Sequence, residues 1–251
     1  MKTYVCETEL SAEQIRAEQR AAILNKSHKL AIQVAPELIA RPLYVCDARD
    51  FAGLPTFCGC LGWAHDNPIT DWPLADALGD RWQGLGPIIA LDFPAIEEAA
   101  DPGAFERCCL SVLLHEVAHV LPPPPPMADL PKTPRLKKLQ LEVMASTTKA
   151  HEVQPGSTRD GHGPAFIRRA LHLYVRAAAL GYSIPLGGLL GSSNPYRQRE
   201  EFYLPWVLPE ALRMMAANFA TIEATPPPPA LVELVQADVD FYNRNWKRGN
   251  E

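Results

Sequence analysis

The spacing of hydrophobic and polar residues predicts a helix near the N-terminus, then short strands, and only helices beyond residue 100. Ser11-Ala-Glu-Gln14 has the pattern of a capping box and predicts a helix over 12–25. The apolar face of that helix comprises Ile15, Ala22 and Ile23. Stretches rich in β-forming residues predict strands over 42–48, 58–64 and 87–93. This order of elements is typical of an α+β fold.

A long helix is predicted between two proline signals. Asp101-Pro102 is typical of a helix start, with Asp as the N-cap and Pro in the first helical position. The helix runs to about residue 121, because the five prolines at 122–126 cannot continue it. Residues 122–160 then form a Pro-rich insertion that holds one short helical segment near 139–150 and a basic patch that we expect to be solvated. The patch comprises Lys132, Arg135, Lys137 and Lys138.

The next helix is predicted to start at Asp160-Gly-His-Gly-Pro164 and to end near Gly181, a natural C-cap. Its apolar stripe comprises Phe166, Ile167, Ala170, Leu171, Tyr174 and Val175. On its other side the chain places a series of basic and imidazole side chains, for which we expect a solvated face. This series comprises Arg168, His172 and Arg176, four residues apart. Arg168 with Arg169 could contact phosphate, but a solvated face is the simpler interpretation.

Residues 183–251 are predicted to form a helical C-terminal extension. The sequence predicts a Gly/Ser loop over 187–194, a helix that begins at Pro209 and runs through Met215, and a last amphipathic helix over 231–246. Trp206 and the last helix need a surface to bury against. We therefore expect the extension to dock on the rest of the chain, which spans residues 1–182.

Composition and charge do not favour a basic nucleic-acid binder, a membrane-spanning protein or a secreted protein. The chain has 251 residues, of which 47% are hydrophobic, and a net charge of −5, which excludes a globally basic nucleic-acid binder. It has no apolar run long enough to span a membrane and no secretory signal, so we expect a cytoplasmic protein. Its six cysteines are then expected to be reduced and mostly buried, and no second Cys-x-x-Cys pair completes a metal site with Cys58-Gly-Cys60.

The motif His115-Glu-Val-Ala-His119 carries the candidate chemistry. Two histidines four residues apart lie on one face of a helix, and that spacing lets both imidazoles reach a single Zn²⁺. Glu116 lies beside them and can accept a proton from a metal-bound water. The flanking residues are apolar, so an unliganded set would be costly to bury.

A catalytic zinc site usually has a third protein ligand. A histidine six residues after His119 is excluded, because that position is Pro125. The candidates that remain are His162, next to glycines just before a helix, the carboxylate of Glu142, and, more weakly, His151.

His115-Glu-x-x-His119 followed by Gly161-His-Gly-Pro-Ala-Phe166 resembles the SprT-like (Spartan-type) zinc metallopeptidase domain, over roughly residues 10–182. The resemblance implies a zincin-like core with a small sheet packed on the metal helix, and it assigns His162 as the third ligand of Zn²⁺. It also implies a protein or peptide substrate and an association with DNA. The acidic balance does not favour DNA, and no cysteine after Cys109 is present to form a zinc ribbon.

The resulting hypothesis is a zinc-dependent peptidase in which Glu116 is the general base. Two alternatives stay open: a peptidase similar to the ImmA/IrrE type with Glu142 as third ligand, and a non-catalytic zinc-containing module that binds a partner. Asp160 is a candidate to orient His162, although an N-cap role is simpler. Cys108 is expected to pack and His172 to lie at the surface. The candidates to stabilise an oxyanion are Tyr174, Tyr182, Tyr196, Tyr203 and Arg197.

Overall fold

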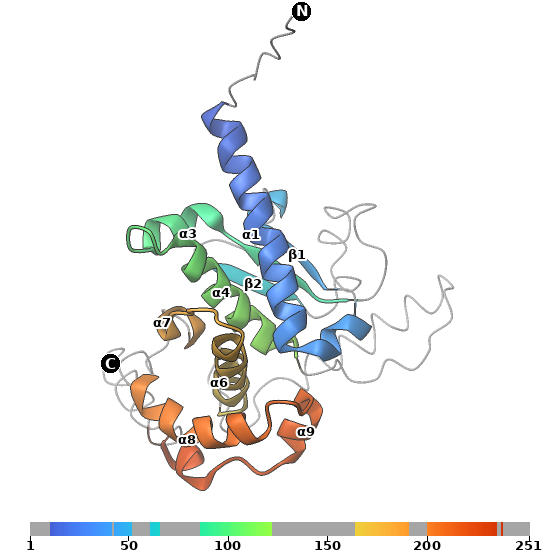
Figure 1. Cartoon of the computed structure of the whole chain (residues 1–251), viewed down its shortest axis with the longest axis vertical. Helices are drawn as coiled ribbons and strands as arrows, with labels where there is room; N and C mark the ends of the chain where they lie inside the picture. Colours follow the sequence, from blue (N-terminus) through green and yellow to red (C-terminus); the bar gives the residue numbers. More distant parts are fainter. Residues whose placement is uncertain are drawn as a thin grey trace, which may run out of the picture.

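The computed structural model describes residues 11–41, 43–51, 61–65, 86–121, 164–190 and 200–234, together with residue 237. Over these residues the fold is α+β, mostly helical with one small sheet (Figure 1). No helix in these ranges is long and apolar enough to cross a membrane. The elements are α1 (Ala12–Val34), η1 (Pro36–Ala40), β1 (Tyr44–Asp47), η2 (Ala48–Phe51), β2 (Gly62–His65), β3 (Ile88–Leu91), α3 (Phe93–Ala99), α4 (Phe105–Val120), α6 (Pro164–Ala179), α7 (Leu186–Leu190), α8 (Glu200–Arg213) and α9 (Phe219–Ala224), followed by a helical turn over 229–234.

The first helix starts where the capping box predicts. The Ser11 hydroxyl accepts the Gln14 backbone N–H at 3.2 Å, and the Gln14 side chain accepts the Ser11 N–H at 2.8 Å. The predicted end at residue 25 is wrong, since α1 continues to Val34. Of the predicted apolar face, Ile23 is buried as expected, whereas Ile15 and Ala22 are exposed. Only the second half of α1 packs on the core, through side chains that begin at Ile23 and include Leu30 and Val34.

The sheet has the strand order β1-β3-β2 and mixed direction. β1 pairs with β3 in parallel, from Tyr44 opposite Ile88 to Asp47 opposite Leu91. β2 pairs with β3 antiparallel, with Gly62 opposite Leu91, and so forms the edge of the sheet within the described residues. All four residues of β3 are buried, because Ile89 and Leu91 face the main core while the other two join a small cluster on the opposite face. The strands predicted over 42–48 and 87–93 are confirmed, and of the one predicted over 58–64 the structure describes the end, in β2.

Helix α4 lies at the centre of the molecule, between α1 with the sheet and the group formed by α6, α7 and α8 (Figure 1). Its predicted start at Asp101-Pro102 is wrong, because α4 begins at Phe105. Residues 101–104 form a turn instead: the Ala104 N–H donates to the Asp101 carbonyl at 2.9 Å, and Gly103 has a φ of +79°. Pro followed by a Gly with positive φ is the signature of a type II turn, which the helix-start reading overlooked.

The helices after residue 163 pack on α4 and on one another. α6 runs from Pro164 to Ala179, and Gly181 (φ +85°) caps it as predicted. The Tyr182 N–H donates to the Ala177 carbonyl and the Gly181 N–H donates to the Ala178 carbonyl, which makes a Schellman cap. The predicted loop over 187–194 is wrong in its first part, because α7 occupies Leu186–Leu190. The predicted helix start at Pro209 is also wrong, because α8 begins at Glu200 and contains Pro205 and Pro209. Trp206, expected to be buried, is 51% exposed.

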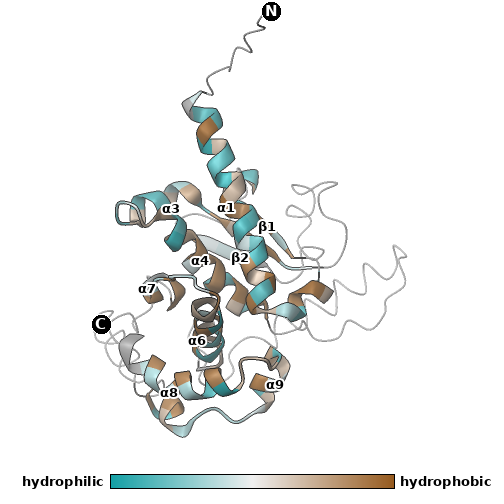
Figure 2. Ribbon diagram, in the orientation of Figure 1, coloured by the Kyte–Doolittle hydropathy of each residue, from teal (hydrophilic) through white to brown (hydrophobic). Residues whose placement is uncertain are grey.

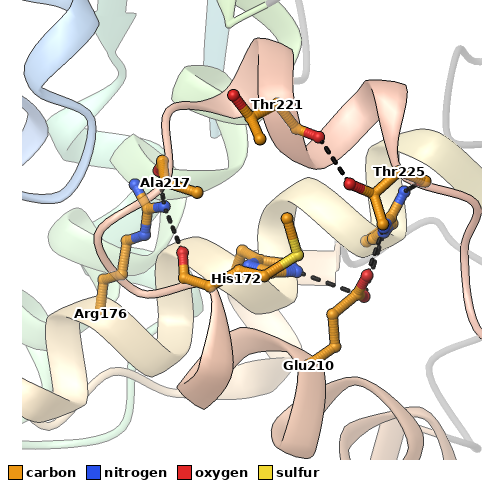
Figure 3. Close-up of polar contacts among 8 residues, drawn as sticks. His172, Arg176, Glu210, Ala217, Thr221 and Thr225 are labelled. Atoms are coloured by element: carbon orange, nitrogen blue, oxygen red, sulfur yellow. Dashed lines mark hydrogen bonds and ion pairs between the residues drawn. The ribbon is translucent and has the colours of Figure 1, made fainter.

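The second side of α6 is not the solvated face that the sequence predicts. Arg168, His172 and Arg176 are 5%, 0% and 6% exposed, because α8 packs on α6 and Phe219 of α9 covers His172 and Arg176. Figure 3 shows Glu210 of α8 turned toward His172, and Ala217 beside the Arg176 guanidinium. The expectation that His172 lies at the surface is therefore wrong.

Each arginine of this buried stripe has protein partners. Arg168 forms a bidentate ion pair with Glu210, and it also donates a hydrogen bond to the Thr225 carbonyl at 2.8 Å. Arg176 donates to the carbonyls of Val34 at 2.8 Å and Ala217 at 2.5 Å, which lie at the ends of α1 and of the turn after α8. These ion pairs and hydrogen bonds of the α6 arginines thus hold the helices after residue 199 against the core.

Candidate metal centre

The His-Glu-x-x-His motif lies in the buried part of helix α4. All residues of α4 from Cys109 to Val120 are buried except His119, which is partly exposed. Figure 2 shows the contrast in hydropathy: α4 is largely brown, whereas much of α1 is teal. A helix that is apolar around most of its circumference belongs in a core. His115 and Glu116, at 8% and 6% exposed, therefore need a physical reason to be there.

The two imidazoles converge. His115 Nε2 and His119 Nε2 lie 3.3 Å apart. Two nitrogens bound to one tetrahedral Zn²⁺ at the usual bond length lie about 3.3–3.4 Å from each other. The histidine rotamers thus already have the separation that a shared zinc ion requires.

The orientation of His115 is set by a backbone carbonyl. His115 Nδ1 lies 2.8 Å from the carbonyl oxygen of Leu189 in α7. Because a carbonyl only accepts, Nδ1 carries the proton, and the lone pair of the ring is on Nε2. In the chain without metal His119 Nε2–H then donates toward that lone pair. A neutral imidazole held by a carbonyl at one nitrogen, with the other directed at the site, is the usual arrangement of a metal-binding histidine.

Helix α7 reaches α4 through a close contact that needs a glycine. One turn before His115, the Ser111 hydroxyl donates to the Pro185 carbonyl at 2.6 Å. A Cβ atom on Gly188 would lie 2.7 Å from Ser111 Oγ and 3.1 Å from Ser111 Cβ. Gly188 therefore allows the approach that brings the Leu189 carbonyl to His115. The sequence does not predict this support, because the adjacent Gly187-Gly188, which is its signal, is also typical of a loop.

Phe166 forms one wall of the site. Its ring centroid lies 4.9 Å from that of His115 and 4.5 Å from that of His119. Phe166 ends the segment Gly161-His-Gly-Pro-Ala-Phe166, so the structure brings the two motifs singled out in the sequence into direct contact. The Phe166 ring therefore packs against both imidazoles.

Glu116 lies beneath the edge strand of the sheet. A Cβ atom on Gly62 would lie 2.6 Å from Val112 Cγ1 and 3.4 Å from Glu116 Cγ, so only glycine lets β2 pass this close to α4. Burial raises the pKa of the Glu116 carboxyl to about 8. Among the described residues the Glu116 carboxyl has no hydrogen bond or ion pair. It is a buried acid without a structural partner in that part of the chain.

Most of the other candidate site residues lie outside the described residues. These are His162, Glu142, His151, Asp160, Tyr196, Arg197, the basic patch over 132–138 and Cys58-Gly-Cys60. Within the described residues no group of three or more metal-ligating side chains occurs, and His115 with His119 supplies two. The three described cysteines are free thiols, with Cys46 and Cys109 buried and Cys108 partly buried.

Three of the tyrosines that were candidates to stabilise an oxyanion lie among the described residues, namely Tyr174, Tyr182 and Tyr203. Tyr182 packs on Lys26, which pairs with Glu106 in the first turn of α4. That turn lies about 20 Å along the helix from His119, so Tyr182 is excluded as an oxyanion-stabilising residue. Tyr174 is partly buried against the core and Tyr203 is wholly buried in it.

The donor set fits a zinc ion. Two imidazole nitrogens at the right separation, one of them oriented by a carbonyl, and an acid beside them are the groups that a zinc-dependent hydrolase uses. Compared with models of protein families, with curated proteins and with solved structures, the chain matches none of them.

Proposed function

We propose that the protein is a zinc-dependent metallopeptidase with a zincin-like core, in which His115 and His119 hold Zn²⁺ and Glu116 is the general base. The observation that supports this most strongly is the 3.3 Å separation of the two Nε2 atoms next to a buried carboxyl group that has no partner among the described residues. A purely structural zinc site does not need that carboxyl group, and burying it without a role is unfavourable. The Glu116 side chain therefore favours catalysis over a non-catalytic binding module.

His162 is the proposed third ligand. The resemblance to the SprT-like domain assigns it, and the contact of Phe166 with both imidazoles supports the assignment. His162 lies two positions before Pro164, where α6 begins, so the chain can place it at most about 7 Å from the start of that helix. Glu142 remains the alternative ligand, and the experiment below separates the two.

Zinc, when bound, lowers the pKa of a coordinated water molecule and polarises the substrate carbonyl. Glu116 accepts the proton of the attacking water and then donates it to the leaving amine. Surroundings of low polarity make its carboxylate a stronger proton acceptor than an exposed glutamate, in the direction of its raised pKa. The Leu189 carbonyl keeps the protonated nitrogen of His115 away from the site.

The edge strand offers a place for a peptide substrate. β2 lies at the edge of the described sheet and passes over Glu116 at Gly62. An extended peptide that pairs with such an edge is held by its backbone, independently of most of its side chains. We therefore propose an unfolded or extended protein segment as the substrate.

DNA is not part of the proposed function. Arg168 and Arg169, which could otherwise contact phosphate groups, are already bonded inside the protein: Arg168 to Glu210, and Arg169 to the Ala118 carbonyl and Glu223. The net charge of −5 also opposes binding to a polyanion.

Elemental analysis and a hydrolysis assay test the proposal together. The wild type, His162→Ala and Glu142→Ala proteins are purified without added metal, and zinc per chain is measured along with cleavage of a denatured protein. We expect one zinc ion and cleavage in the wild type and in Glu142→Ala, and loss of both in His162→Ala. Zinc retained in His162→Ala but lost in Glu142→Ala would transfer the third-ligand role to Glu142. A wild type that takes up no zinc even when it is supplied would contradict the proposed function.

A further inference from the structure

The last turn of α4 carries His119 and is held from outside the helix. His119 is the last residue but one of α4, and Leu121 N–H makes the final helical bond, to the Val117 carbonyl at 3.1 Å. The carbonyls from Ala118 onward have no partner within the helix. Five prolines follow at 122–126, and proline has no N–H to donate to those carbonyls.

Two arginines supply the missing donors, one on each side of His119. Arg169 Nε donates to the Ala118 carbonyl at 2.8 Å, and Arg41 donates from its terminal nitrogen to the Val120 carbonyl at 2.8 Å. Positive charge at the C-terminal end of a helix is also favoured by the helix dipole. The residues directly before and after His119 are thus fixed by guanidinium groups from α6 and from the segment after η1.

Arg169 is itself held on its second side. Its terminal nitrogen donates to Glu223 Oε1 of α9 at 2.7 Å, and its side chain is only 11% exposed. One planar guanidinium thus connects α9 to the backbone of the metal helix. A lysine has a single ammonium group and cannot reproduce both contacts with the same geometry.

We infer that Arg169, braced by Glu223, is a positioning residue for His119, through which the C-terminal helices contribute to the metal site. This inference rests on the proposed function, since it concerns the zinc site of His115 and His119. A zinc site tolerates ligand displacements of only about 0.2 Å, whereas an uncapped last turn of a helix frays by more than that. Losing the Arg169 bond releases the turn that carries His119 and leaves His115 in place.

The test is the zinc dissociation constant of the full chain, measured by competition with a chelator. We expect about tenfold weaker binding in Arg169→Gln, the lower end of the usual range for residues that orient ligands, and an intermediate loss in Arg169→Lys. Glu223→Gln keeps the Arg169 contact to Ala118 and should weaken binding only about two- to threefold. Its side chain is one-third exposed, so this variant keeps the inference testable if Arg169→Gln does not fold.

Glu106→Gln is the matched control. It removes an exposed ion pair, to Lys26, from the first turn of the same helix, about 20 Å from His119. The visible absorption of the Co²⁺-substituted protein serves as a second readout, because it reports ligand geometry and not fold stability. We expect this spectrum to change in Arg169→Gln and to stay unchanged in Glu106→Gln.

The outcomes separate the two proposals. Zinc affinity and a Co²⁺ spectrum that are unchanged in Arg169→Gln and Glu223→Gln, in a wild type that binds zinc, would overturn the positioning role alone. An equal loss of affinity in Glu106→Gln would also overturn it, since the effect would then come from general loosening of α4. A wild type that binds no zinc would remove the proposed function, and the positioning role with it.

Discussion

Two helices of this protein carry buried polar side chains four residues apart, and their surroundings differ. On α6 the series is Arg168, His172 and Arg176, and its charges are met by Glu210 and by backbone carbonyls. On α4 the series is His115 and His119 with Glu116 between them.

The two sets differ in how their charges and hydrogen bonds are satisfied. Burial opposes ionisation of Glu210, but Arg168 and His172 outweigh it, and the pKa of Glu210 lies below its usual value. Glu116 has no such partner among the described residues, and burial raises its pKa to about 8. The charged groups of the α6 set are paired within the protein and hold the fold together, although His172 Nδ1 and Arg176 Nε have no hydrogen-bond partner among the described residues. The α4 set presents converging nitrogens and a buried carboxyl group whose charge no described residue balances. Spacing is the same in both, so the difference in partners is what points to α4 as the functional site.

The largest expected effect comes from Glu116→Gln. Removal of a general base lowers the rate of peptide hydrolysis by about 10²–10⁴-fold, while an amide of the same shape leaves the histidines in place. Cleavage of a denatured protein and zinc content are measured on the same sample. Cleavage at the wild-type rate would show that Glu116 is not the base.

The same chemical change on α6 should affect the fold instead. Glu210→Gln leaves the Arg168 guanidinium buried without a counter-ion, which we expect to lower the free energy of unfolding by about 3–5 kcal/mol. Denaturant titration measures this, with Glu97→Gln on the exposed face of α3 as a control that should change by no more than about 0.5 kcal/mol. Where Glu210→Gln still folds, its zinc affinity should equal that of the wild type. A stable Glu210→Gln protein with weakened zinc binding would reverse the roles assigned to the two helices.

His172 should make the fold sensitive to acid. Burial lowers its pKa to about 4, although Glu210 acts in the opposite direction and Arg168 and Arg176 add to the lowering. Between pH 6.5 and 4 the unfolded chain therefore binds a proton that the folded chain does not, so stability is full above pH 6.5 and falls as the pH drops toward 4. The loss amounts to about 3 kcal/mol at most. Denaturant titrations at several pH values should show a flatter profile in His172→Gln, and an unchanged profile would count against this reading.

A smaller effect is expected from Gly188→Ala, which pushes α7 away from Ser111 and moves the Leu189 carbonyl from His115. Zinc binding should weaken by about tenfold. The double variant Ser111→Ala/Gly188→Ala removes the 2.7 Å contact and should recover part of the loss. Equal affinities in the wild type and in Gly188→Ala would mean that the carbonyl does not orient the histidine.

The features that could be predicted from the sequence are those that depend on residues close together in the chain. The capping box, two of the strands, the apolar stripe of α6 and the histidine pair follow from short patterns, and the structure bears them out. The support of the site could not be predicted, because the Leu189 carbonyl and Gly62 reach α4 from segments distant in the chain. The α6 stripe was misjudged for the same reason: its charges look identical whether water or α8 covers them.

The most direct test of the comparison is zinc content in the wild type, His119→Ala and His172→Gln proteins, each dialysed against metal-free buffer after incubation with zinc. The account predicts one zinc ion per chain in the wild type and in His172→Gln, and much less in His119→Ala. Zinc that stays in His119→Ala, or a wild type that retains none, would contradict it.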